Sequence, residues 1–168
     1  RTVVFLKGCP LRCQWCQNPE SQLSRLEVMY DAEKCAACHR CIEHCPNHAI
    51  RIDYYFGLLS DPEICKGCGL CTEACYYSAR KLMGHAYSVP ELMHEVCKDK
   101  SYFENSGGGV TFSGGEPLLQ SGFLMHVCRA CRREQIHTAI ETCGNVAWQA
   151  FNHLIDELDL IFYDFKHI

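Results

Sequence analysis

The sequence predicts an α/β protein with a parallel sheet, interrupted by a cysteine-rich insert. After Ala86, helical and strand-like apolar patterns alternate along the chain, which is typical of βα units. An apolar run at residues 2–8 indicates one more buried strand at the start. Between about residues 30 and 80 the apolar runs shorten and cysteines recur. We therefore expect one sheet-containing domain and one inserted domain of a different kind.

Local patterns predict the individual elements. Ser88-Val-Pro-Glu91 has the spacing of a capping box and predicts a helix from there to about Lys100. The apolar spacing of Leu119, Phe123 and Val127 predicts a second helix. The remaining pattern gives this order: strand 109–112, helix 118–134, strand 137–141, helix 147–158 and strand 160–165. Since the carboxyl ends of parallel strands meet at one edge, we expect the chemistry there.

Composition and charge exclude some classes of protein. The chain has 168 residues with 48% hydrophobic content, enough for one core of ordinary size. A net charge of −4 without a basic stripe argues against a nucleic-acid partner. No apolar run approaches the ~20 residues of a membrane span. Arg129, Arg132 and Arg133, the tightest basic group, are expected to form a solvated helix face. The chain starts and stops inside strand-like runs, so we expect an excerpt of a longer protein.

Cysteine is the exceptional component, with fifteen residues. A secreted disulfide scaffold is one interpretation of that density. The count is odd, however, and eleven of the fifteen fall into metal-ligand spacings, which favours reduced, metal-bound thiolates in a cytoplasmic protein. Cys128 and Cys131 lie one helical turn apart and are expected to be packing residues. Cys97 and Cys143 are likewise expected not to be ligands.

The first motif places Cys9, Cys13 and Cys16 directly after the first strand. Three thiolates hold three corners of a [4Fe–4S] cube and leave one iron open. Metal catalysis requires such an open position, whereas structural sites are closed. A Cys3His zinc site is the alternative, but the first histidine, His39, lies inside a different motif. Gly8 is expected to permit the tight turn before Cys9.

A second motif occurs twice, offset by 30 residues. Each copy has the cysteine spacing of bacterial ferredoxins, in which the fourth cysteine of each run ligates the other cluster. The spacing therefore predicts two [4Fe–4S] clusters, one on Cys35, Cys38, Cys41 and Cys75 and one on Cys65, Cys68, Cys71 and Cys45. A double zinc site is the alternative. Full cysteine ligation leaves no metal for His39, His44 and His48, which we expect at the surface.

The text around the first motif, Phe5-Leu-Lys-Gly-Cys-Pro-Leu-Arg-Cys-Gln-Trp-Cys-Gln-Asn-Pro-Glu-Ser21, resembles radical S-adenosylmethionine (SAM) enzymes. It is most similar to their glycyl-radical-enzyme activating branch, the pyruvate formate-lyase-activating-enzyme-like family of ferredoxin-insert type. The resemblance implies a partial (β/α) barrel from residues 1–29 and 81–168, with its C-terminal part missing. It also implies an α+β ferredoxin-like insert at 30–80.

The same resemblance implies how SAM is held. Its amino and carboxylate groups would chelate the open iron, and Trp15 would border the adenine; shielding of the cluster from water is the alternative for Trp15. Gly114-Gly115-Glu116 resembles the motif that binds the methionine amino group; a flexible turn is the alternative interpretation of these three residues. Glu141 stands where the family commonly has an acidic SAM contact.

The last strand ends in an Asp-x-Lys motif, Asp164 and Lys166. In the family that this motif resembles, Lys166 would hold the SAM carboxylate as a point charge. Asp164 would face the ribose or a bound monovalent cation. Without the other motifs, a surface ion pair is the interpretation we would favour for these two residues.

The implied activity is that of an oxidoreductase. One-electron reduction would cleave SAM to methionine and a 5′-deoxyadenosyl radical, which abstracts hydrogen from a glycine of a partner glycyl-radical enzyme. The insert clusters would take electrons from a flavodoxin- or ferredoxin-type donor in an anaerobic cytoplasm. A radical SAM enzyme acting on a small molecule or peptide is one alternative. An electron-transfer ferredoxin is another, but it leaves Cys9–Cys16 and Gly114–Glu116 unexplained. No residue identifies the partner.

Overall fold

The chain folds into two compact units. The structure is a computed structural model that describes residues 1–166. One unit consists of Arg1–Ser24 and the described residues from Ala86 onward, and the other of Arg25–His85. No helix among the described residues is both long and apolar enough to cross a membrane. The domain boundaries expected from the sequence stay a prediction.

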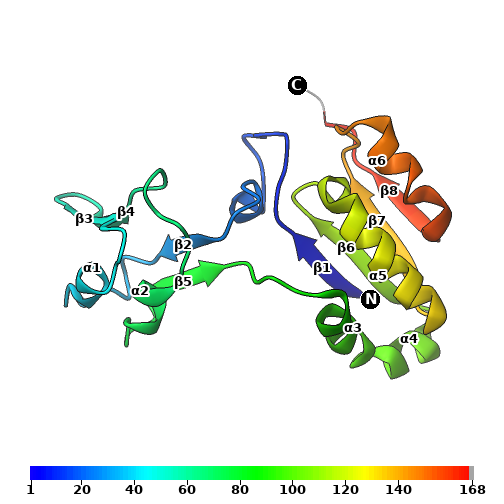
Figure 1. The fold of residues 1–168 in the computed structure, drawn as a ribbon, viewed down its shortest axis with the longest axis horizontal. Helices are drawn as coiled ribbons and strands as arrows, with labels where there is room; N and C mark the ends of the chain where they lie inside the picture. The colour runs from blue at the N-terminus through cyan, green and yellow to red at the C-terminus, as the bar shows by residue number, and fades with distance from the viewer. Residues whose placement is uncertain (167–168) are drawn as a thin grey trace. The chain divides into compact units, whose positions relative to one another are not determined.

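The first unit contains a four-stranded parallel sheet in the order β1-β6-β7-β8 (Figure 1). The strands are β1 (Thr2–Leu6), β6 (Gly109–Gly114), β7 (His137–Thr142) and β8 (Leu160–Tyr163). All three pairings are parallel, and Leu6 lies opposite Gly114. The predicted α/β class with a parallel sheet is therefore confirmed. The partial barrel stays a prediction.

Helices connect the strands of this unit. They are η1 (Pro19–Ser21), α3 (Val89–Cys97), α4 (Lys100–Ser106), η2 (Pro117–Gln120), α5 (Ser121–Arg133), α6 (Trp148–Asn152) and η3 (Ile155–Glu157). The predicted capping box is present: the Ser88 hydroxyl accepts from the Glu91 N–H, and the Glu91 carboxylate accepts from the Ser88 N–H. The chain leaves α3 at Cys97 and forms α4, which the sequence analysis did not predict. Phe103 of α4 is buried in the core.

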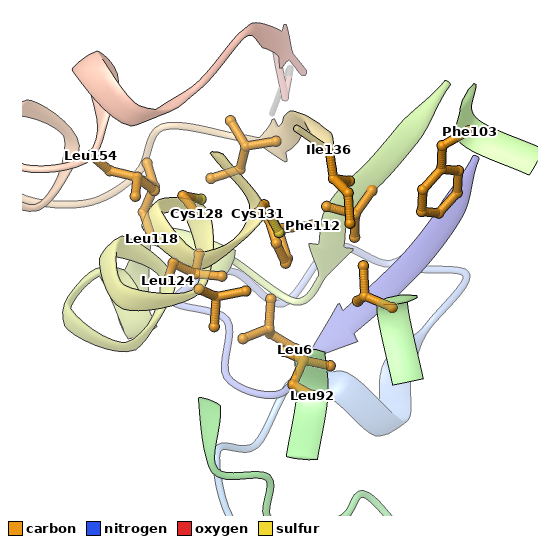
Figure 2. Packing of buried hydrophobic residues seen from close by; sticks show 14 residues of the cluster. Leu6, Leu92, Phe103, Phe112, Leu118, Leu124, Cys128, Cys131, Ile136 and Leu154 are labelled. Carbon is orange, nitrogen blue, oxygen red and sulfur yellow. The ribbon is translucent and has the colours of Figure 1, made fainter. Parts of the chain in front are cut away.

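The hydrophobic core lies between this sheet and its helices. Figure 2 shows Leu6 and Phe112 of the sheet close to Leu124, Cys128 and Cys131 of α5. Both cysteines are completely buried, so their predicted packing role is confirmed. On the exposed side of α5, Arg129 and Arg132 each pair with Glu157 at 2.9 Å.

Two predicted helices differ from the structure. The 118–134 segment begins as the 3-10 turn η2, whose tighter period displaces the apolar stripe. As a result Leu119 is 51% exposed, and the buried face of α5 begins at Leu124. The 147–158 helix is interrupted between α6 and η3, where Leu154 is completely buried. The last strand, β8, ends at Tyr163 rather than at residue 165.

The second unit shows the repeat in its elements. Strand β2 (Glu27–Tyr30) pairs antiparallel with β5 (Arg80–Met83), and β3 (Ile50–Asp53) with β4 (Gly57–Ser60). The short helices are α1 (Arg40–Glu43) and α2 (Leu70–Glu73). Elements β4, α2 and β5 begin 30 residues after β2, α1 and β3, respectively. The two sequence copies therefore fold alike.

Candidate functional site

A cavity of about 390 Å³ lies in the first unit at the carboxyl ends of the four parallel strands. Nine residues singled out from the sequence line it: Cys9, Cys13, Trp15, Cys16, Gly114, Gly115, Glu141, Asp164 and Lys166. They come from four separate segments of the chain. We call this space the main cavity.

Backbone hydrogen bonds fix the cysteine loop that follows β1. Gly8 has φ +105°, a conformation that L side chains rarely adopt, so the expected turn is present. Its N–H donates to Ser21 O at 2.7 Å, and the Cys9 N–H donates to Gln22 O at 2.9 Å. The Gln120 side-chain amide donates to Lys7 O at 2.8 Å. The loop is thereby held at both ends before any ligand arrives.

The glycine pair is required by backbone packing. A Cβ atom on Gly114 would lie 2.4 Å from the backbone N and O of Leu6, and one on Gly115 would lie 2.2 Å from Gly8 O. The Gly115 N–H donates to Leu6 O at 2.9 Å. The two glycines therefore let the end of β6 touch the chain leaving β1, and the same backbone forms part of the cavity wall.

Glu116 is turned away from the main cavity. It is completely buried and is not among the lining residues. Its Oε1 accepts from the Thr142 hydroxyl at 2.6 Å and from the Leu118 N–H at 3.1 Å. Its Oε2 accepts from the N–H and the thiol of Cys143, at 2.9 and 3.0 Å. These donors occupy both carboxylate oxygens in this structure, and a direct Glu116 contact with SAM stays a prediction.

Three charged groups do face the main cavity. Glu141 is exposed, and its Oε2 accepts from the Ser113 hydroxyl at 2.5 Å. Lys166 and Asp164 form an ion pair. This contact raises the pKa of Lys166 above its usual value, so the group stays an ammonium. Lys166 and Asp164 therefore form an ion pair and also line the main cavity.

Ser113, Thr142 and Cys143 also line the cavity, although sequence reasoning did not select them. Cys143 was expected not to be a ligand, but it lines the same cavity as Cys9, Cys13 and Cys16. Burial, and then its hydrogen bond to Glu116, raises the pKa of this thiol to about 11. A neutral thiol is a poor metal ligand. Its position two residues after Glu141 was the signal that could have placed it at the strand edge.

The second unit has two smaller cavities, each lined by four cysteines. Cavity A is lined by Cys35, Cys38, Cys41 and Cys75. Cavity B is lined by Cys45, Cys65, Cys68 and Cys71. The structure therefore brings the fourth cysteine of each run to the other run, in the grouping that the ferredoxin spacing suggests. His39, His44 and His48 are exposed and line neither cavity.

The donor sets fit iron–sulfur clusters. All fifteen cysteines lie within the described residues and are free thiols, and thiolates are the ligands that such clusters take. The Ala37 N–H donates to Cys35 Sγ at 3.4 Å, and the Ala49 N–H to Cys45 Sγ at 3.3 Å. In residues 1–166 no three acidic, histidine or cysteine side chains converge closely enough to hold a single metal ion. The cysteines instead line cavities, as ligands of a multi-iron cluster would.

Comparison with known proteins agrees with this chemistry. The chain belongs to the family of 4Fe-4S single cluster domains, whose model matches residues 63–164. The model of the 4Fe-4S dicluster domain matches residues 34–79, which contain all eight cysteines of cavities A and B. The chain is thus an iron–sulfur protein by sequence as well as by donor set.

Three curated relatives align with the whole chain. An isethionate sulfite-lyase activating enzyme of Oleidesulfovibrio alaskensis is 42% identical, a 4-hydroxyphenylacetate decarboxylase activating enzyme of Clostridioides difficile 43%, and a (2S)-3-sulfopropanediol dehydratase activating enzyme of Klebsiella oxytoca 46%. Each alignment covers 100% of this chain but only 54–56% of the relative. The chain therefore spans about half the length of these relatives. The resemblance to activating enzymes is confirmed.

Proposed function

We propose that this chain is part of a glycyl-radical enzyme activating enzyme of the radical SAM type. The supporting observation is that Cys9, Cys13 and Cys16 line one cavity together with charged groups from the ends of other strands. Three thiolates beside free charged groups suit a cluster that has one iron open to an amino-acid-like ligand. A closed structural site would need no such cavity.

The residues of the main cavity that the sequence singled out then have these roles. Cys9, Cys13 and Cys16 hold the cluster, which when bound supplies the electron that cleaves SAM to methionine and the 5′-deoxyadenosyl radical. Lys166 offers an ammonium to the SAM carboxylate, and Trp15 offers an apolar face to the adenine.

The remaining polar groups orient SAM or the cavity wall. Glu141 is placed to accept from an amino or hydroxyl group of SAM, and Asp164 from the ribose, unless a monovalent cation binds there. Gly114 and Gly115 shape the wall. Glu116 acts one layer behind, by positioning Thr142 and Cys143.

The second unit would carry two further clusters, one in cavity A and one in cavity B, giving three in all. Residues 30–80 would then be the ferredoxin-like insert of a partial barrel formed by 1–29 and 81–168. Its function would be to pass electrons from a flavodoxin- or ferredoxin-type donor in the anaerobic cytoplasm. Clusters with full thiolate ligation reach the low potentials that this requires.

The partner would be a glycyl-radical enzyme. The relatives are named for a sulfite-lyase, a decarboxylase and a dehydratase, so we place the partner among enzymes of these reaction classes. Glycine suits hydrogen abstraction because no side chain blocks the approach to its Cα.

Electron paramagnetic resonance of the full-length, anaerobically reconstituted protein tests this proposal. Adding SAM to the reduced protein should change the spectrum of one cluster, and adding a glycyl-radical enzyme should yield 5′-deoxyadenosine and a protein-based glycyl radical. Cys13→Ala should abolish both effects, whereas the matched Cys97→Ala should not. A spectrum indifferent to SAM would refute the proposal. Fast deoxyadenosine release that depends on a small substrate would support the rival enzyme class instead.

A further inference from the structure

Cavities A and B can be compared position by position, because the 30-residue repeat relates them. Cys35, Cys38 and Cys41 of cavity A correspond to Cys65, Cys68 and Cys71 of cavity B. The correspondence extends to the non-ligand wall, where Leu58 of cavity A matches Val28 of cavity B. Any difference at a corresponding position is therefore a difference built into otherwise similar sites.

The main difference is charge. Arg80 lines cavity A and is 3% exposed, whereas its counterpart Ile50, also buried, lines cavity B. Arg40 lines cavity A as well, but its counterpart Leu70 is 43% exposed and is not among the residues that line cavity B. The basic residue of cavity B, Lys66, is exposed, so water screens its charge.

The guanidinium of Arg80 is held in place by neighbouring groups. Its Nη1 donates to the Ser60 hydroxyl at 2.7 Å and its Nη2 to Leu58 O at 2.5 Å. It also lies 5.0 Å from the centroid of the Tyr30 ring. The remaining donor, Nε, is buried without a protein partner. None of these partners is a carboxylate that would neutralise the positive charge. Because the guanidinium is buried, water screens its charge less than it would at the surface.

Hydrogen bonds to sulfur do not cancel this difference. Each cavity has a backbone N–H donor to one cysteine, Ala37 to Cys35 in cavity A and Ala49 to Cys45 in cavity B. Donors to the thiolate sulfurs and positive charge both favour the more negative, reduced state of a cluster.

We infer that the two clusters of this unit are electronically unequal and that Arg80, assisted by Arg40, makes the cluster in cavity A the easier one to reduce. The inference rests on the proposed ligation. One electron from a low-potential donor takes a four-thiolate [4Fe–4S] centre from a net charge of about −2 to about −3. The fixed guanidinium stabilises the added charge, so the first electron resides in cavity A.

Arg80 also reaches toward cavity B, because its Nη1 donates to the hydroxyl of Ser60, which lines that cavity. Removing this charge should therefore lower both potentials. The potential of the cavity A cluster should fall further, because Arg80 lines that cavity and not the other. The measurable quantity is the gap between the two midpoint potentials.

The test uses the full-length protein with Cys9, Cys13 and Cys16 all changed to alanine, so that only these two clusters remain. Redox titration followed by paramagnetic resonance gives two midpoints, and Cys75→Ser or Cys45→Ser shows which signal belongs to which cavity. We expect the signal altered by Cys75→Ser to be reduced first. Arg80→Gln should narrow the gap between the two midpoint potentials by at least about 59 mV, which is a tenfold change in the one-electron equilibrium. Arg80→Lys, which keeps the charge, should preserve most of it.

Two controls separate the possible outcomes. Arg51→Gln removes the same charge from an exposed position that lines neither cavity, and it should leave the gap unchanged. Arg40→Leu installs the residue of the corresponding position and should also narrow the gap, which covers a failure of Arg80→Gln to fold. Cavity B reducing first, or a gap indifferent to both arginines, would overturn the inference alone. An iron content well below about eight would refute the dicluster proposal itself.

Discussion

At the scale of single residues, Glu116 is a motif residue whose side chain links two elements behind the wall of the main cavity. Four donors from three residues surround its buried carboxylate. Together they join the start of η2 to the end of β7, where Thr142 and Cys143 line the main cavity. A buried acceptor that loses its donors has neither protein nor water to bond to, so small chemical changes at this carboxylate should be costly in stability.

Glu116→Gln should destabilise the protein by about 1–3 kcal/mol, because its amide NH2 would face donors instead of accepting from them. Glu141→Gln, at an exposed cavity position, should change stability by less than about 0.5 kcal/mol but weaken SAM binding. Urea unfolding and calorimetric SAM titration of the reconstituted protein measure the two effects. If Glu116→Gln unfolds like the parent yet loses SAM, Glu116 contacts the ligand after all.

What sequence could predict at this scale depends on distance along the chain. The short spacings of Cys9, Cys13 and Cys16 were enough to single them out, and they share a cavity because they lie on one loop. The donors to Glu116 include groups 26 and 27 residues away, which no local pattern announces. The backbone approach that excludes a side chain at Gly115 is also tertiary, since it involves Gly8.

At the scale of elements, capping chemistry and apolar alternation were good guides where one signal dominated. The capping box at Ser88 located the start of α3, and the four strands of the sheet were all expected. A helix across 118–134 was expected, and Phe123 and Val127 do face the core, but Leu119 does not, because η2 changes the helical period before α5 begins. Pattern reading assumes one period throughout, so it could not detect that change or the break at Leu154.

Helix α5 carries a prediction about pH. Burial, the largest cause, raises the pKa of both Cys128 and Cys131 from 9.0 to about 12. The folded state therefore keeps these thiols protonated where the unfolded chain would release the protons. This contribution to stability is complete below about pH 9 and is lost as the pH rises toward 12.

Urea unfolding between pH 8 and 11 should accordingly show falling stability in the parent protein. The Cys128→Ala, Cys131→Ala double variant should be less stable at pH 8, by about 1 kcal/mol or more from lost packing, but should decline less with pH. Cys97→Ala retains both buried thiols and should keep the decline. Iron content should be the same in all three proteins; a loss of iron from the double variant would show that these cysteines are ligands.

At the scale of the whole molecule, the eleven ligand candidates divide between the two units without sharing. Cys9, Cys13 and Cys16 line a cavity of the first unit, and the eight cysteines of cavities A and B all belong to Arg25–His85. Each unit also has its own buried hydrophobic cluster. A set of ligands that is complete within one folding unit needs nothing from the other unit to assemble its metal centre.

Changing Cys9, Cys13 and Cys16 together to alanine should therefore lower the iron content from about twelve to about eight per chain while leaving two intact clusters. The complementary change, Cys45→Ala with Cys75→Ala, takes one ligand from each cavity of the second unit and should spare the SAM-responsive signal. Iron analysis and paramagnetic resonance of anaerobically reconstituted protein measure both. If the first variant lost nearly all its iron, cluster assembly in the second unit would depend on the first unit. The division of the ligands between the two units would then not make their clusters assemble independently.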